Sequence, residues 1–596
     1  MGNSLSVSYD QDGRRAILLF RGEDRVWPFI RRICQDNSDQ TEILARTSLS
    51  VPWWAFLACQ KEIDYQSQRH RIDVIADPVA QSKLDQAQQH KEGYLAARDA
   101  EPVPEDTVLA TLSKVGFIRE LTTEQLRNVC RLASAPSGAT FSVPGAGKTT
   151  EALAFYSVKR REETRLLVVA PKNAFAAWEE QLDACLIDSS QFVRLVGGYE
   201  AIKSILSRNP SKCLITYQQL PNVVGLISEY VGSHHCFVFL DESHRIKRGF
   251  EGVIGNAILS FSEVPAGKLI MSGTPMPNDV SDLVPQFRFL FPEITSDADN
   301  VRDLIAPIYV RTTKDELKLP PVTKTAIPVP LKPAQYELYE LLRSEAARQA
   351  KRDLPIGDRM RLRKAGQSAL RLLQVVSNPG LLAKVDFDHP DLLSEVLAEG
   401  DSPKLEYACL RARQLASEGR KCIIWSSFVS NVELIAKRLL DLGGDYIHGG
   451  VDAGSEFEDG TREQKIRRFL DDDGCMVLVA NPAACGEGIS LHTVCHNAIY
   501  LDRNYNAAQY LQSEDRIHRL GLAPGQATYV ELLFSPGTVD ESVERRLNAK
   551  IRNMAEVLED PSLHVEPVLI DVDADIEAFD LEDMRDFLLH LSKRDG

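Results

Sequence analysis

Residues 142–149 combine the residue types that bind the phosphates of a nucleotide. They read Ser-Val-Pro-Gly-Ala-Gly-Lys-Thr, with Ser142 where a phosphate-binding loop usually has its first glycine. Glycines let the backbone curl so that its N–H groups point at phosphate oxygens, and a following helix adds its positive N-terminal end. We expect Lys148 to contact the terminal phosphates and Thr149 to ligate Mg²⁺. The expected ATP-binding residues are Pro144, Gly145, Ala146, Gly147, Lys148, Thr149 and Thr150.

A pair of acids follows an apolar run further along the chain. Residues 238–240 are Val-Phe-Leu, and Asp241 and Glu242 come directly after them. A buried parallel strand that ends in two acids places both at the carboxyl edge of its sheet, where ligands of open α/β sheets bind. Asp241 is then expected to hold Mg²⁺, and Glu242 to orient and deprotonate the attacking water. Two acids at a strand end are commonly just solvated, but the phosphate loop upstream favours the catalytic interpretation.

Two arginines near the end of the chain could complete this chemistry. Arg516 and Arg519 are three residues apart in the string Gln-Ser-Glu-Asp-Arg-Ile-His-Arg-Leu-Gly that begins at Gln512. On a helix they would share a face. An arginine that neutralises charge on a transferred phosphoryl group raises the rate by orders of magnitude. An exposed arginine pair on a helix is frequent, but the ordered string around this pair favours a catalytic role.

The ordered set of motifs resembles the Swi/Snf-type family of helicase-like ATPases, within the DEAD/DEAH-like helicase superfamily two. Residues 241–247 follow the family's Asp-Glu-x-His-Arg-x-Lys pattern, and Gly273, Thr274, Pro275 and Asn278 its Gly-Thr-Pro-x-x-Asn pattern. The resemblance spans about residues 113–550. It implies further roles: adenine recognition by Gln125, phosphate approach at Gly488, coupling of the lobes by His244, Ser272, Thr274 and Gln512, and nucleic-acid contacts at Pro171, Thr216 and Ser427.

Several positions depart from the family pattern. Tyr505 and Ala507 stand where the family has Trp and Pro, and Cys485 and Ser490 where it has Gly and Asn. The chain is therefore identified as a divergent member. The departures weaken the expectation for the nucleic-acid contacts more than that for the ATP chemistry.

Short apolar runs alternate with helical stretches in two parts of the chain. The expected strands are 166–170, 214–216, 236–240 and 269–271 in the first part, and 422–425, 476–480, 498–501 and 529–533 in the second. This alternation predicts buried parallel sheets with helices on both faces. With the resemblance, the fold class is α/β: two RecA-like parallel-sheet lobes, a helical insertion and an N-terminal accessory α+β domain.

The predicted domains follow these changes in pattern. They are an accessory domain of unknown role at 1–112, lobe 1 at 113–318, a linker and helical insertion at 319–400, lobe 2 at 401–552 and an acidic tail at 553–596. In the accessory domain, 6–9 and 16–20 read as strands around Asp12-Gly13, 79–97 as a helix, and Trp53 and Trp54 as core aromatics.

Two charged segments fall outside the motifs. Residues 348–371 contain eight Lys or Arg against two Asp, which indicates either a solvated helix face or an arm that contacts a phosphate backbone. Prolines between 320 and 333 are expected to break the chain ahead of this segment. The acidic tail is expected to be solvated and partly helical.

Composition limits the remaining choices. A net charge of −16 argues against coating nucleic acid by bulk attraction but allows a motor with one basic cleft. No apolar run suits a membrane span or a secretion signal, so we expect no membrane partner and a cytoplasmic or nuclear location. The scattered cysteines, without a Cys-x-x-Cys pair, indicate reduced thiols rather than zinc. A protein partner is expected to supply targeting.

Three functions remain open at this point. The first is an ATP-driven translocase on double-stranded DNA that remodels protein–DNA complexes, with ATP and Mg²⁺ as cofactors. The second is a strand-separating DNA or RNA helicase, although no separation pin can be read. The third is a nucleic-acid-binding regulatory subunit with an inactive ATP site, which the presence of Lys148, Asp241, Glu242, Arg516 and Arg519 disfavours.

Overall fold

The computed structural model describes residues 3–10, 15–22, 25–38, 40–187, 190–352, 358–384, 387–451, 460–485, 490–519, 521–523, 525–560 and 579–592. These residues form two compact units that meet in the sequence at Thr312 and Thr313. The first contains most of the described residues up to 312, and the second most of those that follow. No described helix combines the length and hydropathy needed to cross a bilayer.

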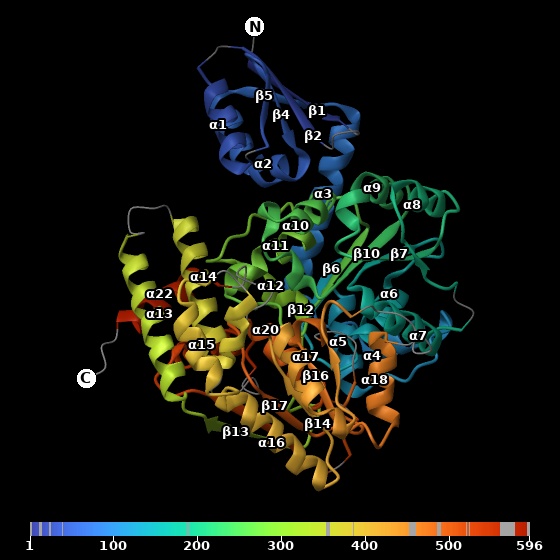
Figure 1. Cartoon of the computed structure of the whole chain (residues 1–596). Coiled ribbons are helices and arrows are strands. Elements are labelled where there is room, and N and C mark those ends of the chain that lie inside the picture. The colour runs from blue at the N-terminus through green and yellow to red at the C-terminus, as the bar shows by residue number, and fades with distance from the viewer. Residues whose placement is uncertain are drawn as a thin grey trace. The chain divides into compact units, whose positions relative to one another are not determined.

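The N-terminal part of the first unit is a five-stranded mixed sheet (Figure 1). Its strand order is β3 (Glu42–Ala45), β4 (Ser48–Pro52), β2 (Arg15–Arg21), β1 (Asn3–Asp10) and β5 (Ile72–Ala76). Helices α1 (Trp27–Asn37) and α2 (Trp53–His70) share its apolar core. The two predicted strands are confirmed as the antiparallel pair β1 and β2. The predicted turn at Asp12-Gly13 lies outside the described residues.

Helix α3 (Pro78–Asp99) leads from this sheet to the rest of the first unit. The Tyr94 hydroxyl donates to the Leu304 carbonyl at 2.8 Å. Trp53 is buried in the small core, and Trp54, also buried, stacks on Phe250 with 3.8 Å between ring centroids. The prediction of core aromatics is confirmed, and Trp54 also packs the N-terminal sheet against the larger part of the unit.

The larger part of the first unit is built on a seven-stranded parallel sheet. Its strand order is β12 (Tyr309–Val310), β6 (Ser137–Thr140), β11 (Gly267–Met271), β10 (Cys236–Asp241), β7 (Arg165–Val169), β9 (Lys212–Ile215) and β8 (Val193–Arg194). The four strands expected from apolar runs are β7, β9, β10 and β11. Their residues are almost all buried, as expected for a parallel sheet covered on both faces.

Helices surround this sheet (Figure 1). They are α4 (Glu105–Lys114), α5 (Thr123–Ala133), α6 (Lys148–Lys159), α7 (Phe175–Cys185), α8 (Tyr199–Leu206), α9 (Val224–Gly232), α10 (Val253–Leu259), α11 (Leu283–Leu290) and α12 (Val301–Ile305). Val108 and Leu112 of α4 belong to the same core as α5, α6 and α7.

The second unit contains a six-stranded parallel sheet. Its strand order is β13 (Val322–Pro328), β18 (Thr528–Phe534), β17 (Asn497–Tyr500), β14 (Cys422–Trp425), β16 (Val477–Ala480) and β15 (Asp445–Ile447). The prolines around 320–333 were expected to break the chain, but β13 forms between them. Because β13 is an edge strand, it needs ladder hydrogen bonds on one side only, which tolerates its terminal Pro328.

Two sets of helices complete the second unit. One set consists of α16 (Pro403–Ser417), α17 (Val429–Arg438), α18 (Arg462–Asp471), α19 (Pro482–Cys485), α20 (Ala507–Glu514) and α21 (Val539–Val557). The helical insertion contributes α13 (Pro333–Arg352), α14 (Asp358–Ser377) and α15 (Pro390–Ala398).

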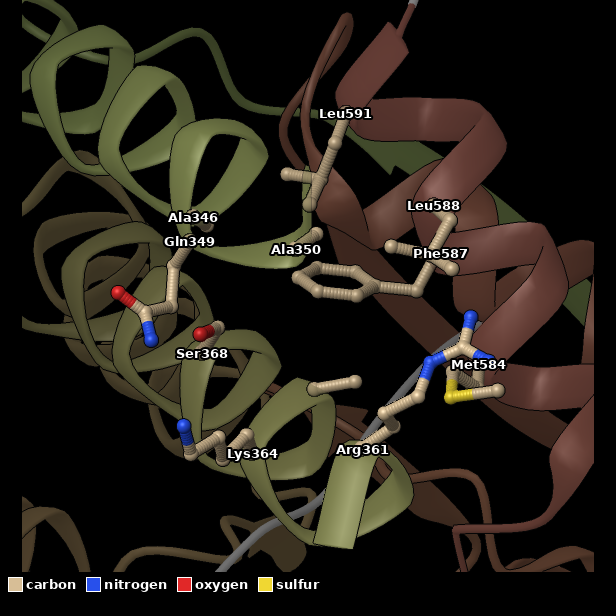
Figure 2. Close-up of a pocket in the computed structure, with 11 residues that line it drawn as sticks. Ala346, Gln349, Ala350, Arg361, Lys364, Ser368, Met584, Phe587, Leu588 and Leu591 are labelled. Carbon is tan, nitrogen blue, oxygen red and sulfur yellow. The ribbon is translucent and has the colours of Figure 1, made fainter. Parts of the chain in front are cut away.

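The C-terminal helix α22 (Leu581–Ser592) packs on α13 and α14. Figure 2 shows Phe587 of α22 directed at Ala350 of α13, with Met584 beside it. Phe587 is fully buried, as is Asp583. The acidic tail was expected to be solvated, which is wrong for residues 579–592, because an apolar face in this segment docks on the insertion.

Candidate active site

The phosphate loop connects β6 to α6. Gly145 and Gly147 have φ of +88° and +85°, the left-handed region in which glycine avoids a steric penalty. A Cβ at Gly147 would also collide with the amide of Gln125, so this close approach requires glycine. The Lys148 ammonium donates to the Ser142 carbonyl at 2.9 Å, which holds it within the curl of the loop. The loop therefore has the backbone shape that its sequence predicted.

Gln125 lies at the start of α5 as part of a capping box. Its side-chain Oε1 accepts from the Thr122 backbone N–H at 3.1 Å, and the Gln125 backbone N–H donates to the Thr122 hydroxyl. The side chain is buried against Gly147. The residue predicted to recognise adenine thus lies next to the phosphate loop. Its side-chain amide oxygen already accepts a hydrogen bond within the helix cap.

Ser142 replaces the usual glycine because its hydroxyl has partners. It accepts from the Thr312 backbone N–H at 3.1 Å and lies 3.4 Å from both oxygens of Glu151. Glu151 is fully buried and also accepts from Thr140 at 2.7 Å and Asn128 at 2.8 Å. Burial raises the pKa of Glu151, which the donors from Thr140 and Asn128 partly oppose. A glycine at 142 would remove the acceptor of the Thr312 N–H.

The hydroxyl of Thr150 is directed at α7. The residue is buried, and this hydroxyl donates to Gln181 of α7 at 3.1 Å. The prediction that Thr150 binds the cofactor therefore needs correction for the side chain, because the hydroxyl packs α6 against α7. Only its backbone N–H, in the first turn of α6, remains suited to an anion.

The acidic pair lies at the carboxyl end of β10, as predicted. Glu242 has φ of +56°, and its Oε2 lies 3.4 Å from His244 Nδ1 and 3.5 Å from the Ser272 hydroxyl. Ser272 follows β11, the strand between β6 and β10, and its hydroxyl lies 3.0 Å from His244 Nδ1. It also accepts from the Thr274 backbone N–H at 3.1 Å. The expected base and three expected coupling residues thus form one cluster.

The charge state of this cluster follows from its surroundings. Burial lowers the pKa of His244 well below its usual 6.5, and the positive charges of Arg245, Lys247 and Lys148 lower it further. His244 is therefore neutral at pH 7. Because the charge of Lys148 acts on His244, the phosphate loop and the acidic motif share one electrostatic environment.

Two aromatic residues position Asp241 in a way that the sequence did not reveal. The indole N–H of Trp178 donates to Asp241 Oδ2 at 2.9 Å, and the Tyr217 hydroxyl donates to its backbone carbonyl at 2.7 Å. Both aromatic side chains are fully buried. The two side chains therefore orient the predicted magnesium ligand. Their spacing along the chain gave no signal of this role.

The three predicted nucleic-acid residues have different environments. Pro171 follows β7 and Thr216 follows β9, so both lie at the carboxyl edge of the first unit's sheet. Ser427, after β14, is fully buried, and its backbone N–H donates to Asp502 at 2.8 Å. Its predicted contact with nucleic acid does not suit this structure, because the side chain does not reach the surface.

The arginine segment lies in the second unit, beyond the end of α20. Arg516 and Arg519 were expected on one helix face, but α20 ends at Glu514 and the chain continues in turns. Arg516 Nε donates to the Gln512 carbonyl at 3.0 Å, and Arg519 Nη1 donates to the Ser490 hydroxyl at 2.6 Å. Ser490, a departure from the family pattern, is therefore a partner of the second arginine. The predicted Gly488 lies outside the described residues.

Two lysines hold the acids that precede these arginines. Lys314 Nζ lies 2.6 Å from Asp515 Oδ1 and 3.6 Å from Glu514 Oε1, and Lys324 Nζ lies 2.7 Å from Glu514 Oε2. Burial alone would raise the pKa of Glu514, but the charges of Lys324 and Lys314 lower it to about 2. Burial lowers the pKa of Lys314, and the charges of Asp515 and Glu514 raise it above its ordinary value. Glu514 and Lys314 are therefore both charged at pH 7.

A basic groove lies on the helical insertion of the second unit. Its volume is about 670 Å³. The basic side chains that line it are Arg348, Arg352, Lys364 and Arg371, with Gln349, Gln367 and Gln374 among them and Glu345 and Asp388 as the acids. The residues belong mostly to α13 and α14, the helices that carry the basic segment noted in the sequence.

Family models match most of both lobes. Residues 130–381 match an SNF2-related domain, and residues 404–521 match a helicase conserved C-terminal domain. The ISWI chromatin-remodeling complex ATPase ISW1 of Saccharomyces cerevisiae is 23% identical over 449 residues, which are 68% of this chain and 37% of the relative. The putative ATP-dependent helicase/translocase YwqA of Bacillus subtilis is 26% identical over 446 residues, 68% of this chain and 45% of the relative.

Among solved structures, the Sulfolobus solfataricus SWI2/SNF2 ATPase core in complex with dsDNA is 21% identical. That match covers 78% of this chain and 96% of the other, with a TM-score of 0.32. This chain spans less than half of the length of the two curated relatives.

Proposed function

The chain is a divergent member of the Swi/Snf-type family of helicase-like ATPases, and on that premise we propose that it hydrolyses ATP to move along double-stranded DNA and remodel protein–DNA complexes. The observation that carries the proposal is the cluster at the carboxyl edge of the first unit's sheet. There, the phosphate loop, Asp241, Glu242, His244 and Ser272 follow three neighbouring strands.

Each residue has a part in the proposed reaction. Backbone N–H groups of the loop and the Lys148 ammonium bind the phosphates of ATP. Thr149 and Asp241 would hold Mg²⁺, which neutralises phosphate charge when bound, and the Trp178 indole orients the Asp241 carboxylate for this task. Glu242 orients a water molecule and accepts its proton on a carboxylate oxygen.

The second unit contributes the remaining charge. Arg516 and Arg519 neutralise the negative charge that develops on the transferred phosphoryl group. Movement follows when ATP binding and hydrolysis change the spacing of two lobes that grip a phosphate backbone alternately. Such a grip is independent of base sequence, because phosphates carry no base code. The basic groove on the insertion supports a backbone-binding role for the second unit.

The test is steady-state ATP hydrolysis with and without duplex DNA, with Lys148→Ala as the inactive control. We expect duplex DNA to stimulate turnover and the wild type to displace a triplex-forming strand in an ATP-dependent manner. Displacement of one duplex strand instead would identify a strand-separating helicase. Duplex binding without any ATP turnover would identify a regulatory subunit and reject the proposal.

A further inference from the structure

The segment 311–314 has hydrogen bonds to the phosphate-loop region at one end. The Thr312 backbone N–H donates to the Ser142 hydroxyl at 3.1 Å, and the Val143 N–H donates to the Thr312 carbonyl at 3.0 Å. The Thr312 hydroxyl accepts from Asn128 at 2.9 Å. Thr312 is almost fully buried and is the last residue of the first unit. It therefore forms part of the wall behind the phosphate loop.

The other end of the segment is fixed to the arginine-bearing turn. Lys314 lies in the second unit, two residues beyond Thr312, and its ammonium contacts Asp515 and Glu514. Asp515 immediately precedes Arg516. The side chains of Glu514 and Asp515 are 5% and 3% exposed, so their ion pairs are shielded from solvent screening.

Lys324 on β13 adds a second anchor to the same turn. Its ammonium lies 2.7 Å from Glu514 and over the ring of Tyr510 in α20. In addition, His518, between the two arginines, hydrogen-bonds through Nε2 to the Pro320 carbonyl at 2.7 Å. Lys314, Pro320 and Lys324 thus contact the stretch from Glu514 to His518, which begins at the last residue of α20 and continues beyond the helix.

We propose that Lys314 and Lys324 are positioning residues that hold the turn carrying Arg516 and Arg519, and that residues 312–314 tether this turn to the phosphate loop. The inference rests on the proposed function and names a determinant of its reaction. From Thr312 to Lys314 the backbone spans at most about 7 Å. Because this connection is short, we infer that a movement of Ser142 and Thr312 displaces Lys314 and, through its ion pairs, the turn that carries the two arginines.

The first test compares Lys314→Met with Lys314→Arg in duplex-stimulated ATP hydrolysis. We expect Lys314→Met to lower kcat about 10- to 100-fold, because small displacements of catalytic groups have effects of this size. The KM for ATP should change by less than about threefold, since Lys314 is absent from the nucleotide-binding loop. Lys314→Arg keeps the charge opposite Asp515 and should restore most of kcat.

The matched control is Lys332→Met, which removes another half-buried lysine of the second unit. Lys332 contacts Glu406 at 2.8 Å and the Asp401 carbonyl at 2.7 Å, away from the arginine turn. Because Glu406 is 48% exposed, we expect Lys332→Met to lower the thermal unfolding midpoint less than Lys314→Met and to leave kcat unchanged. Equal kcat in both variants would overturn the proposal. If Lys314→Met does not fold, Asp515→Asn provides the same comparison.

A double-mutant cycle tests the tether itself. Ser142→Ala removes the hydroxyl that accepts the Thr312 N–H, and Lys314→Met releases the other end of the segment. If one segment transmits position, the second substitution should have a smaller effect on kcat in the presence of the first. Additive effects would reject the tether. Wild-type protein without ATP turnover on any duplex would instead reject the proposed function, whatever the variants do.

Discussion

Glu242 adopts a backbone conformation that non-glycine residues rarely occupy, at the position where the base is expected. Such strain costs about 1–3 kcal/mol and persists where the surroundings hold it in place. Glu242→Gln keeps the size and hydrogen-bonding reach of the side chain but removes its basicity. We expect turnover to fall by orders of magnitude while nucleotide binding stays within about threefold of the wild type. Hydrolysis at the wild-type rate in this variant would contradict the role of Glu242 as base.

His244 makes stability depend on pH in a defined direction. Its pKa is lowered in the folded state, chiefly by burial, whereas the unfolded chain has the usual 6.5. Below pH 6.5 the unfolded state therefore binds a proton that the folded state does not. The contribution to stability is complete above pH 6.5 and decreases as the pH falls, by up to about 1.4 kcal/mol per pH unit.

The measurement is urea unfolding of the wild type and His244→Gln at pH 7.5 and 5.5. The free energy of unfolding should decrease less in the variant over this interval, because one group that takes up a proton on unfolding is gone. An equal or larger decrease in His244→Gln would show that His244 is already protonated in the folded protein. Comparing the two proteins cancels the carboxylates and other histidines that titrate in the same range.

The roles of the motif residues could be predicted from the sequence, but the side chains that position them could not. The glycine-rich loop pattern indicated Lys148, and Asp241 and Glu242 come directly after a strand that the apolar pattern predicted. The donors to Asp241 and the lysines beside Asp515 come from distant segments. Such contacts depend on strand order in a sheet, which local pattern does not specify.

At the scale of elements, α22 is the clearest departure from expectation. Acidic composition predicted a solvated tail, yet α22 docks on the insertion through its apolar face. Its own Asp583 is buried in the process. A count of charges overlooks the helical spacing of the apolar residues between 579 and 591, which form the buried face of this segment. Similarly, three-residue spacing suggested a helix for Arg516 and Arg519, whereas α20 ends before them.

The docking of α22 depends on a buried ion pair. Asp583 Oδ2 lies 2.7 Å from Lys550 of α21, and the two side chains are 0% and 1% exposed. We expect Asp583→Ala to destabilise the second unit by up to about 3–5 kcal/mol, because the buried Lys550 then keeps only the longer contact to Asp580, at 3.1 Å, among its two acidic partners. Urea unfolding monitored by circular dichroism measures the loss.

Glu582→Ala is the matched control for this prediction. Both acids contact Arg546, but the side chain of Glu582 is 65% exposed. An exposed pair of this kind contributes about 0–1 kcal/mol. Similar losses in the two variants would show that the energetics do not depend on the burial of Asp583.

The net charge of the chain differs in sign from the charge of one local surface, and this difference bears on DNA binding. The chain carries −16, so any attraction of a phosphate backbone must come from a concentrated basic surface. The groove on α13 and α14 is such a surface, with Arg348 and Arg352 at its lining. Each phosphate that a cation neutralises releases counterions, so affinity for duplex DNA should fall steeply with salt.

We expect Arg348→Ala combined with Arg352→Ala to weaken duplex binding and to reduce the slope of log affinity against log salt by about two. Fluorescence anisotropy of a labelled duplex between about 50 and 200 mM KCl measures this slope. Lys351→Ala is the control, because Lys351 is exposed on the same helix but does not line the groove. The control removes one positive charge and the double variant two. If the change in slope per charge removed is the same in both, the attraction is a property of the whole basic helix and not of the groove. An unchanged slope in the double variant would place the phosphate contacts elsewhere, while the ATP chemistry of the first unit would stand on its own evidence.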